Sequence, residues 1–115
     1  MEQFSIDGQS VRMQNLYQLA HSPLIQISLA ESARQKMQES RSYIENRISQ
    51  GEVMYGVNTG FGAFSSVRIS DSEIEQLQRN LIRSHSVGIG EPFDLFQTRA
   101  MMVLRANALA NGHSG

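Results

Sequence analysis

The sequence predicts a mainly α-helical chain with one glycine-rich loop and short extended segments. Apolar residues recur at helical spacing in four stretches, and capping or stop residues bound most of them. A third observation is the stretch Met54–Val67, which carries three glycines within seven residues between two helical patterns. The length of 115 residues is within the range of one domain, so we expect a single domain over residues 1–115.

Composition argues against several functional classes. Ten basic and eleven acidic residues give a net charge of −1, so no clustered positive field indicates nucleic acid as a partner. The absence of cysteine excludes disulfides and cysteine-ligated metals, and no pair of histidines has metal-ligand spacing, so no metal is expected. We expect no leader, and no apolar run approaches the roughly 18 residues needed to span a bilayer. We expect a cytoplasmic protein without a membrane partner.

The first thirty residues are expected to contain an edge strand, a helix and an extended segment. The strand falls within Met1–Gly8 and turns at Asp7-Gly8. Ser10 is the expected N-cap of the helix, and Pro23 should end it. The apolar stripe of this helix consists of Met13, Leu16, Tyr17 and Ala20. A brief extended segment, Leu24–Ile27, follows.

A longer helix is predicted at about Leu29–Gln50. Ser28 and Glu31 have the S-x-x-E spacing of a capping box, and Gly51 supplies the stop. The apolar face consists of Ala33, Met37, Ile44 and Ile48. The opposite face mixes acidic and basic residues, which is typical of a solvated helix surface.

The third predicted helix runs over about Asp71–Ser84. Ser70 and Glu73 repeat the capping-box spacing, and His85 falls at or just past the last turn. The apolar stripe consists of Ile74, Leu77 and Leu81.

The fourth predicted helix, Leu95–Leu109, is apolar on nearly all sides. Asp94 with Gln97 should open it, and Gly112 is the expected C′ glycine. A helix of this kind belongs inside a larger body or at a subunit interface. Its methionines, notably Met101 and Met102, are expected to fill core space, whereas Arg105 and Asn107 would need partners if buried.

Tyr55 and His85 are the candidates for chemistry. Three glycines let the loop after Tyr55 take positive φ values, approach a ligand and move. They are Gly56, Gly60 and Gly62. A phenol ordinarily titrates near pH ~10, so a base role for Tyr55 requires a site that stabilises phenolate; the alternative is a packed or exposed tyrosine. His85 could orient a substrate or exchange a proton, or serve as a polar surface or capping residue.

A phosphate-binding role for the loop is disfavoured by its spacing. The pattern G-x-x-x-G-x-G matches neither the dinucleotide nor the P-loop fingerprint, and no lysine follows it.

Three stretches together resemble the aromatic amino acid ammonia-lyases, the family of histidine, phenylalanine and tyrosine ammonia-lyases and related aminomutases. They are YGVNTGFG at Tyr55–Gly62, LQRNLIRSHSVGIGEPF at Leu77–Phe93 and RAMMVLRANALANGHSG at Arg99–Gly115. Their order and spacing are similar to the N-terminal portion of the family over nearly the whole chain. The resemblance implies the helical, aspartase/fumarase-like fold of these enzymes.

The resemblance also implies roles for individual residues. Tyr55 matches the base that removes a β-proton from the substrate, on a mobile inner loop that includes Gly56, Gly60 and Gly62. His85 matches the residue that contacts the bound amino acid. The Ser84-His85 pair is most similar to histidine ammonia-lyases, although tyrosine aminomutases can carry a similar pair.

The implied function is elimination of ammonia from an aromatic L-amino acid, with histidine, giving urocanate, as the favoured substrate. A tyrosine or phenylalanine ammonia-lyase and a 2,3-aminomutase are alternatives within the family. A non-catalytic helical binding or assembly module is the alternative outside it.

The family depends on methylidene-imidazolone (MIO), an electrophile made from an internal Ala-Ser-Gly, to which the substrate amine is thought to add. No Ala-Ser-Gly occurs in these 115 residues, so MIO cannot form from this chain, and the isolated chain is expected to be inactive. Family members are homotetramers whose active sites combine several subunits, which implies a homo-oligomer here.

Overall fold

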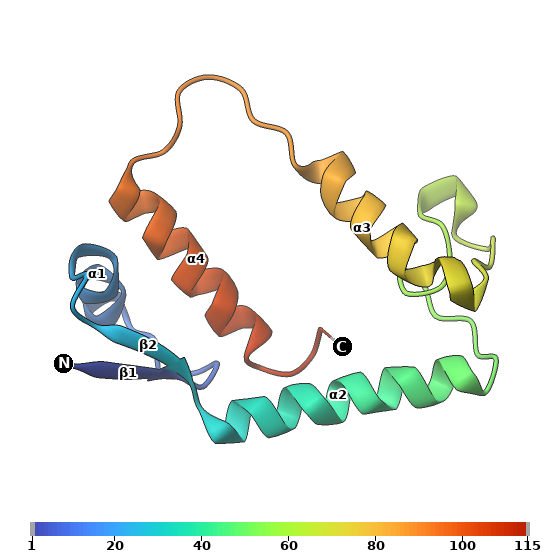
Figure 1. Cartoon of the computed structure of the whole chain (residues 1–115), viewed down its shortest axis with the longest axis horizontal. Helices are drawn as coiled ribbons and strands as arrows, with labels where there is room; N and C mark the ends of the chain where they lie inside the picture. The colour runs from blue at the N-terminus through green and yellow to red at the C-terminus, as the bar shows by residue number, and fades with distance from the viewer. Residues whose placement is uncertain (1, 115) are drawn as a thin grey trace. The chain divides into compact units, whose positions relative to one another are not determined.

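The structure, a computed structural model, describes residues 2–114 and divides into two compact units (Figure 1). Unit 1 comprises residues up to 44 together with those from 91, and unit 2 comprises residues 45–90. The elements are β1 (Gln3–Ile6), α1 (Met13–His21), β2 (Gln26–Leu29), α2 (Glu31–Ser49), α3 (Ile74–His85) and α4 (Leu95–Leu109). The prediction of a mainly helical chain is confirmed. No helix in residues 2–114 is long and apolar enough to cross a membrane.

Strands β1 and β2 of unit 1 pair in parallel, and α1 connects them (Figure 1). Parallel pairing requires such a crossover, because the chain must return to the end at which it began. The expected edge strand is therefore confirmed, whereas the extended segment expected at Leu24–Ile27 lies two residues later. The register places Ser5 opposite Ser28 and continues into α2 through the Ala30 N–H, which donates to the Ile6 carbonyl at 2.8 Å.

The expected turn after β1 is present and is built on Asp7. The Asp7 carboxylate accepts hydrogen bonds from the Ser10 hydroxyl and from the backbone N–H groups of Gln9 (2.8 Å) and Ser10 (2.7 Å). These donors stabilise the ionised form and lower the pKa of Asp7 to about 2, with the Ser10 hydroxyl as the largest contribution. Gly8 takes a φ of 90°, which completes the turn.

The predicted N-caps Ser10 and Ser28 are wrong. The Ser10 side chain belongs to the Asp7 turn, and α1 begins only at Met13, where the Asn15 side chain accepts from the Arg12 N–H at 3.1 Å. Ser28 lies in β2, so its backbone is held by the sheet and α2 begins at Glu31. In both cases a non-local or turn contact occupies the serine that spacing assigned to a cap.

The core of unit 1 consists of a small cluster where β1, α2 and the end of α4 meet. Ile6, Ala33 and Ala110 are buried there. Phe4, Leu29 and Ala30 pack against them. Alanines at two of the three central positions allow the backbones to approach closely.

Helix α1 packs against α4 with only part of the face predicted for it, because Ala20 is buried and Leu16 half-buried but the other two positions are not. Leu19 and Ala20 are buried, whereas Met13 and Tyr17 of the predicted stripe are exposed. The Tyr17 ring instead stacks on His21, with ring centroids 4.1 Å apart, and His21 stacks on Phe96 of α4 at 4.3 Å. Aromatic stacking thus occupies the side of α1 that simple periodicity assigned to the core.

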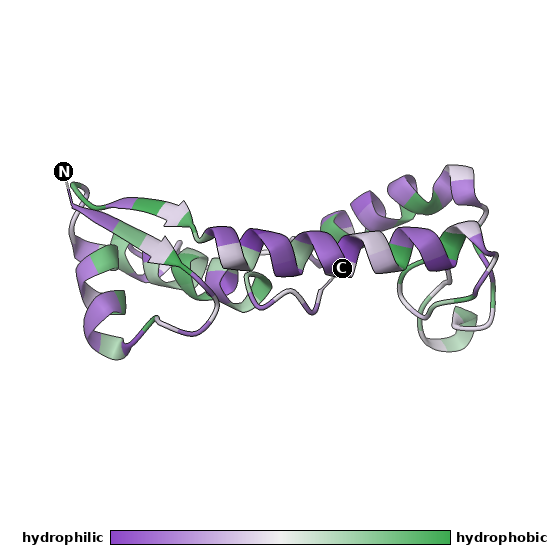
Figure 2. Ribbon diagram, turned by 90° about the horizontal axis from the view of Figure 1, so that it is seen from below, coloured by the Kyte–Doolittle hydropathy of each residue, from purple (hydrophilic) through white to green (hydrophobic). Residues whose placement is uncertain are grey.

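Apart from its start, helix α2 matches its prediction, with a mostly hydrophilic surface (Figure 2) and Ala33 buried. It ends at Ser49 in a Schellman motif. Gly51, with a φ of 78°, donates to the Ile48 carbonyl at 2.9 Å, and the Glu52 N–H donates to the Arg47 carbonyl at 3.1 Å. The predicted glycine stop is confirmed.

Helix α4 has the predicted bounds and the predicted cap. The Gln97 N–H donates to the Asp94 carboxylate at 2.7 Å, and the Asp94 N–H donates to the Gln97 side chain at 3.3 Å. Gly112 was predicted as the C′ residue. Because the C-cap is Ala110, Gly112 lies one residue beyond C′, and its φ is 76°. A Cβ at Gly112 would lie 2.8 Å from the backbone of Lys36, so a glycine lets the chain after α4 pack directly on α2.

The surface of α4 is largely apolar and uncovered within residues 2–114. Val103 is its buried residue, while Met101 and Met102 are 53% and 67% exposed, so the expectation that they fill a core is not met by this part of the chain. Asn107 donates to the Gly8 carbonyl at 3.3 Å, but its buried Oδ1 has no partner among the described residues. Arg105 is exposed. The helix therefore presents an exposed apolar surface of the kind that is typical of contact sites.

We expect the isolated 115-residue chain to self-associate through α4, because exposed apolar side chains lose water-accessible area on contact. Light scattering at tens of micromolar should give a mass above 12.9 kDa, and Met102→Glu should move it towards that value. Gln35→Glu, which adds the same charge on the exposed face of α2, is the matched control. A monodisperse monomer with cooperative unfolding would contradict this expectation and favour a self-sufficient helical module.

Candidate active site

Tyr55 lies in a tight turn at the start of the glycine-rich loop, in unit 2. The turn is closed by the Val57 N–H, which donates to the Met54 carbonyl at 3.1 Å, so Tyr55 and Gly56 hold its two central positions. Gly56 has a φ of 74°, which an L side chain at the second central position adopts only with strain. The glycine after the tyrosine therefore fixes the turn that presents the phenol, whose side chain is exposed.

Two fully buried polar residues hold this turn from beneath. The Asn58 side chain accepts from the Met54 N–H and donates to the Glu52 carbonyl, both at 2.8 Å. The Thr59 hydroxyl accepts from the Gly56 N–H at 3.2 Å and donates to the Gly60 carbonyl at 2.9 Å. Sequence analysis missed both residues, although Asn and Thr next to glycines are typical of turns built by side-chain to backbone hydrogen bonds.

Gly60 and Gly62 serve different purposes in the loop. A Cβ at Gly60 would lie 2.5 Å from the Phe64 Cβ and 2.7 Å from its carbonyl oxygen, so this glycine is required by close packing. Gly62 has a φ of 57° in open space and begins a 3-10 turn, Gly62–Phe64. The loop returns alongside itself, where the Gly60 N–H donates to the Val67 carbonyl at 3.0 Å.

Helix α3 forms the other side of the site and begins later than predicted. Asp71–Glu73 is a single 3-10 turn, and the α-helix starts at Ile74. The predicted capping box is wrong, because the Ser70 hydroxyl donates to the Glu73 carboxylate at 2.6 Å instead of capping the backbone. The Glu73 N–H is satisfied by the Ser70 carbonyl at 2.8 Å.

His85 is the last residue of α3, as predicted. Its Nδ1 lies 2.9 Å from the Leu81 carbonyl and 3.0 Å from the Ser84 hydroxyl, which itself donates to the Leu81 carbonyl at 2.8 Å. A carbonyl only accepts, so this contact assigns the proton of a neutral ring to Nδ1. The helix thereby leaves the other ring nitrogen, Nε2, available as an acceptor.

Tyr55 and His85 line the same open pocket in unit 2, with a volume of about 650 Å³. The other lining residues are Phe61, Leu77, Asn80, Leu81 and Ser84. The Tyr55 and Phe61 rings meet edge to face with centroids 5.9 Å apart. The pocket thus combines a phenol, an imidazole and an apolar wall, which suits a small ligand with a ring and a polar end.

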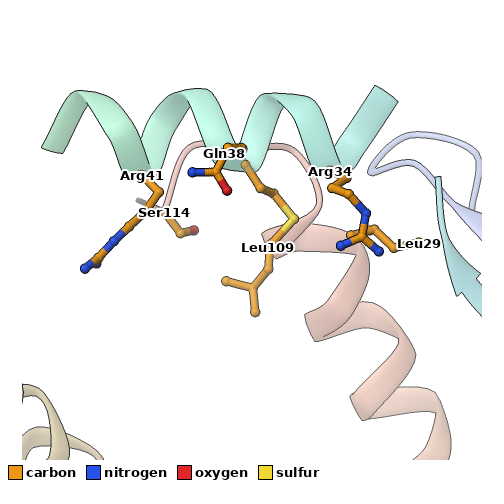
Figure 3. A pocket seen from close by; sticks show the side chains of 8 residues that line it. Leu29, Arg34, Gln38, Arg41, Leu109 and Ser114 are labelled. Carbon is orange, nitrogen blue, oxygen red and sulfur yellow. The ribbon is translucent and has the colours of Figure 1, made fainter. Parts of the chain in front are cut away.

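Unit 1 has a pocket of about 430 Å³ beside α2, to which none of the predicted site residues contributes. Arg34, Gln38 and Arg41 project from one face of α2 near Leu109 of α4 (Figure 3). Among residues 2–114, no group of three His, Cys, Asp or Glu side chains could hold a metal ion.

A family model described as aromatic amino acid lyase matches residues 11–115. The chain belongs to this family. The histidine ammonia-lyase of Anaeromyxobacter dehalogenans (strain 2CP-C) is 41% identical over 115 residues, which are 100% of this chain and 22% of that protein. Histidine ammonia-lyase 2 of Fusobacterium nucleatum is 44% identical over 110 residues, covering 96% of this chain and 21% of that protein.

Solved structures of aromatic amino acid lyases and aminomutases have the same fold in the matching region. Histidine ammonia-lyase from Trypanosoma cruzi matches 97% of this chain and 21% of its own, with a TM-score of 0.87 and 35% identity. Tyrosine aminomutase from Streptomyces globisporus matches 94% and 20%, with a TM-score of 0.85 and 32% identity. The predicted ammonia-lyase fold is confirmed, and this chain spans about one fifth of the length of its curated relatives.

Proposed function

We propose that this chain is the N-terminal portion of an ammonia-lyase that acts on an aromatic L-amino acid, with histidine as the substrate. The observation that carries the proposal is the unit 2 pocket, which brings Tyr55 and His85 together from segments thirty residues apart. The identity to proteins named histidine ammonia-lyase supports histidine over other aromatic amino acids. The family resemblance implies a catalytic role for Tyr55 and a substrate contact for His85, which are the two residues that this pocket brings together.

In this proposal Tyr55 acts as the general base. Its oxygen, in the phenolate form, takes a proton from the substrate β-carbon and becomes a phenol as the Cα–N bond breaks, giving an arylacrylate and ammonia. The turn formed with the positive φ of Gly56 leaves the phenol of Tyr55 exposed at the pocket, where it can reach a ligand. Leu77, Leu81 and Phe61 supply the apolar contacts that a substrate ring requires.

His85 binds the amino acid in this proposal. Because the Nδ1–H donates a hydrogen bond to the Leu81 carbonyl, Nε2 can accept a hydrogen bond from a donor on the substrate. The side chain is anchored by its own helix, so its direction is fixed before the ligand arrives.

The family's MIO group supplies an electrophile for the substrate amine, but the residues of this chain do not provide it. No Ala-Ser-Gly occurs in the 115 residues, so the group would come from polypeptide beyond them. We propose that the whole protein is a cytoplasmic homotetramer in which residues 1–115 form part of a single larger domain. The uncovered apolar surface of α4 supports burial within such a body.

The proposal is tested with a fusion in which this chain replaces the matching residues of the Anaeromyxobacter dehalogenans enzyme. We call this fusion the joined enzyme. We expect urocanate from histidine, followed by its ultraviolet absorbance, and no product from the 115-residue chain alone. Arylacrylate from tyrosine or phenylalanine, or a β-amino acid product, would instead favour the other lyases or an aminomutase. A joined enzyme that assembles like the parent but converts none of these amino acids would contradict the proposal.

A further inference from the structure

Gln78 is a polar residue in the apolar stripe of α3. The half-buried positions of this helix are Ile74, Leu77, Gln78 and Leu81, at the i, i+3, i+4 and i+7 spacing of one face. The Gln78 side-chain amide donates to the Gly56 carbonyl at 2.9 Å and to the Val57 carbonyl at 3.3 Å. A glutamine on this face therefore reaches the turn that carries Tyr55.

This contact differs from the other hydrogen bonds of the loop. The side-chain hydrogen bonds of Asn58 and Thr59 stay within residues 52–60 and shape the turn itself. The Gln78 amide joins the turn to α3, and the same helix carries Leu77 and Leu81 of the pocket wall and His85 at its end. One side chain thus connects the two segments that the proposed reaction requires at a fixed separation.

We propose that Gln78 is a positioning residue that holds the Tyr55 turn against α3 and so sets the place of the phenol relative to a substrate bound at His85. The Gly56 carbonyl lies one residue after Tyr55, so a shift of this peptide moves the Tyr55 ring with it. A displacement of about 1 Å at a reacting group can cost about 100-fold in rate. The inference rests on the proposed function, because it assigns Gln78 a part in that reaction.

Gln78→Leu tests the inference, because it places an apolar residue of similar size on the stripe and removes the amide that makes both hydrogen bonds. In the joined enzyme we expect kcat to fall about 10- to 100-fold, with KM changed less than about threefold, because His85 and the apolar wall remain in place. Gln76→Leu is the matched control: it lies on the same helix, and its amide donates to the Asn80 side chain at 2.8 Å. Equal kcat values for the two variants would overturn the inference.

A second measurement does not depend on turnover. In the full 115-residue chain, amide hydrogen exchange at Val57 and Asn58, both of which donate to the Met54 carbonyl, should be faster in Gln78→Leu than in Gln76→Leu. Unchanged exchange would refute the proposed link even if the joined enzyme is inactive. If exchange is faster but the joined enzyme without substitutions is itself inactive, the proposed function is refuted and the link between Gln78 and the turn remains.

Discussion

Replacing Tyr55 by phenylalanine is expected to lower kcat of the joined enzyme by about 10²- to 10⁴-fold, the range that a positioned general base contributes. The substitution removes one oxygen and keeps the ring that meets Phe61 edge to face. Because Tyr55 is 66% exposed and its turn is closed by backbone and by Asn58 and Thr59, folding should be unaffected. Urocanate production from histidine measures kcat, and far-UV circular dichroism measures the fold.

Tyr17→Phe is the control for this prediction. Tyr17 is also 66% exposed but lies on α1 in unit 1, and phenylalanine preserves its stacking on His21. We expect the kcat of this variant to be within about twofold of that of the joined enzyme without substitutions. A Tyr55→Phe enzyme as active as Tyr17→Phe would remove Tyr55 from the role of base.

Gly60→Ala should open the loop. Its new methyl group would lie 2.5 Å from the Phe64 Cβ and 2.7 Å from the Phe64 carbonyl oxygen, so the backbone itself must move. Overpacking of this kind typically costs about 1–3 kcal/mol. The affected hydrogen bonds run from the Gly60 N–H to the Val67 carbonyl and from the Ile69 N–H to the Asn58 carbonyl. Exchange of these two amides should accelerate by about 5- to 150-fold, and kcat of the joined enzyme should fall as well.

Substitutions at two other glycines distinguish a steric clash from backbone strain as the cause of loop opening. At Gly88 a Cβ meets nothing within 4 Å, so Gly88→Ala should leave exchange in the loop unchanged. At Gly62 the space is also open but φ is 57°, so Gly62→Ala measures backbone strain without the clash. If Gly60→Ala changed exchange no more than Gly88→Ala, the close approach of Phe64 would not govern the loop.

The helices were predictable because their signals are local. The bounds of α4 follow from the Asp94–Gln97 capping box and from the apolar run that continues to Leu109, and the end of α2 follows from Gly51. The starts of α1 and α2 were not predictable in the same way. Ser10 and Ser28 have the right spacing for caps, but one is recruited by Asp7 and the other by strand pairing with a segment more than twenty residues away.

Sequence analysis named two candidate site residues, and the structure places both on the lining of one pocket. Spacing and family resemblance singled out Tyr55 and His85, but only the packing of the loop on α3 shows that they share a cavity. Gln78 left a signal that could have been used, because a glutamine between Leu77 and Leu81 breaks an apolar stripe. Asn58 and Thr59 left a weaker one, since their importance comes from complete burial in a loop whose sequence looks solvent-exposed.

The bare surface of α4 has a consequence for synthesis on the ribosome. In a protein of the length of the A. dehalogenans relative, the segment matching this chain emerges first, and about four fifths of the polypeptide is still to be made. At roughly 5–20 residues per second, that takes about 20–80 s. During this interval Met101, Met102 and Leu104 face water on a helix whose sequence is complete. We expect a nascent chain of that length to be prone to aggregation with neighbouring chains during this interval, because exposed apolar surface associates.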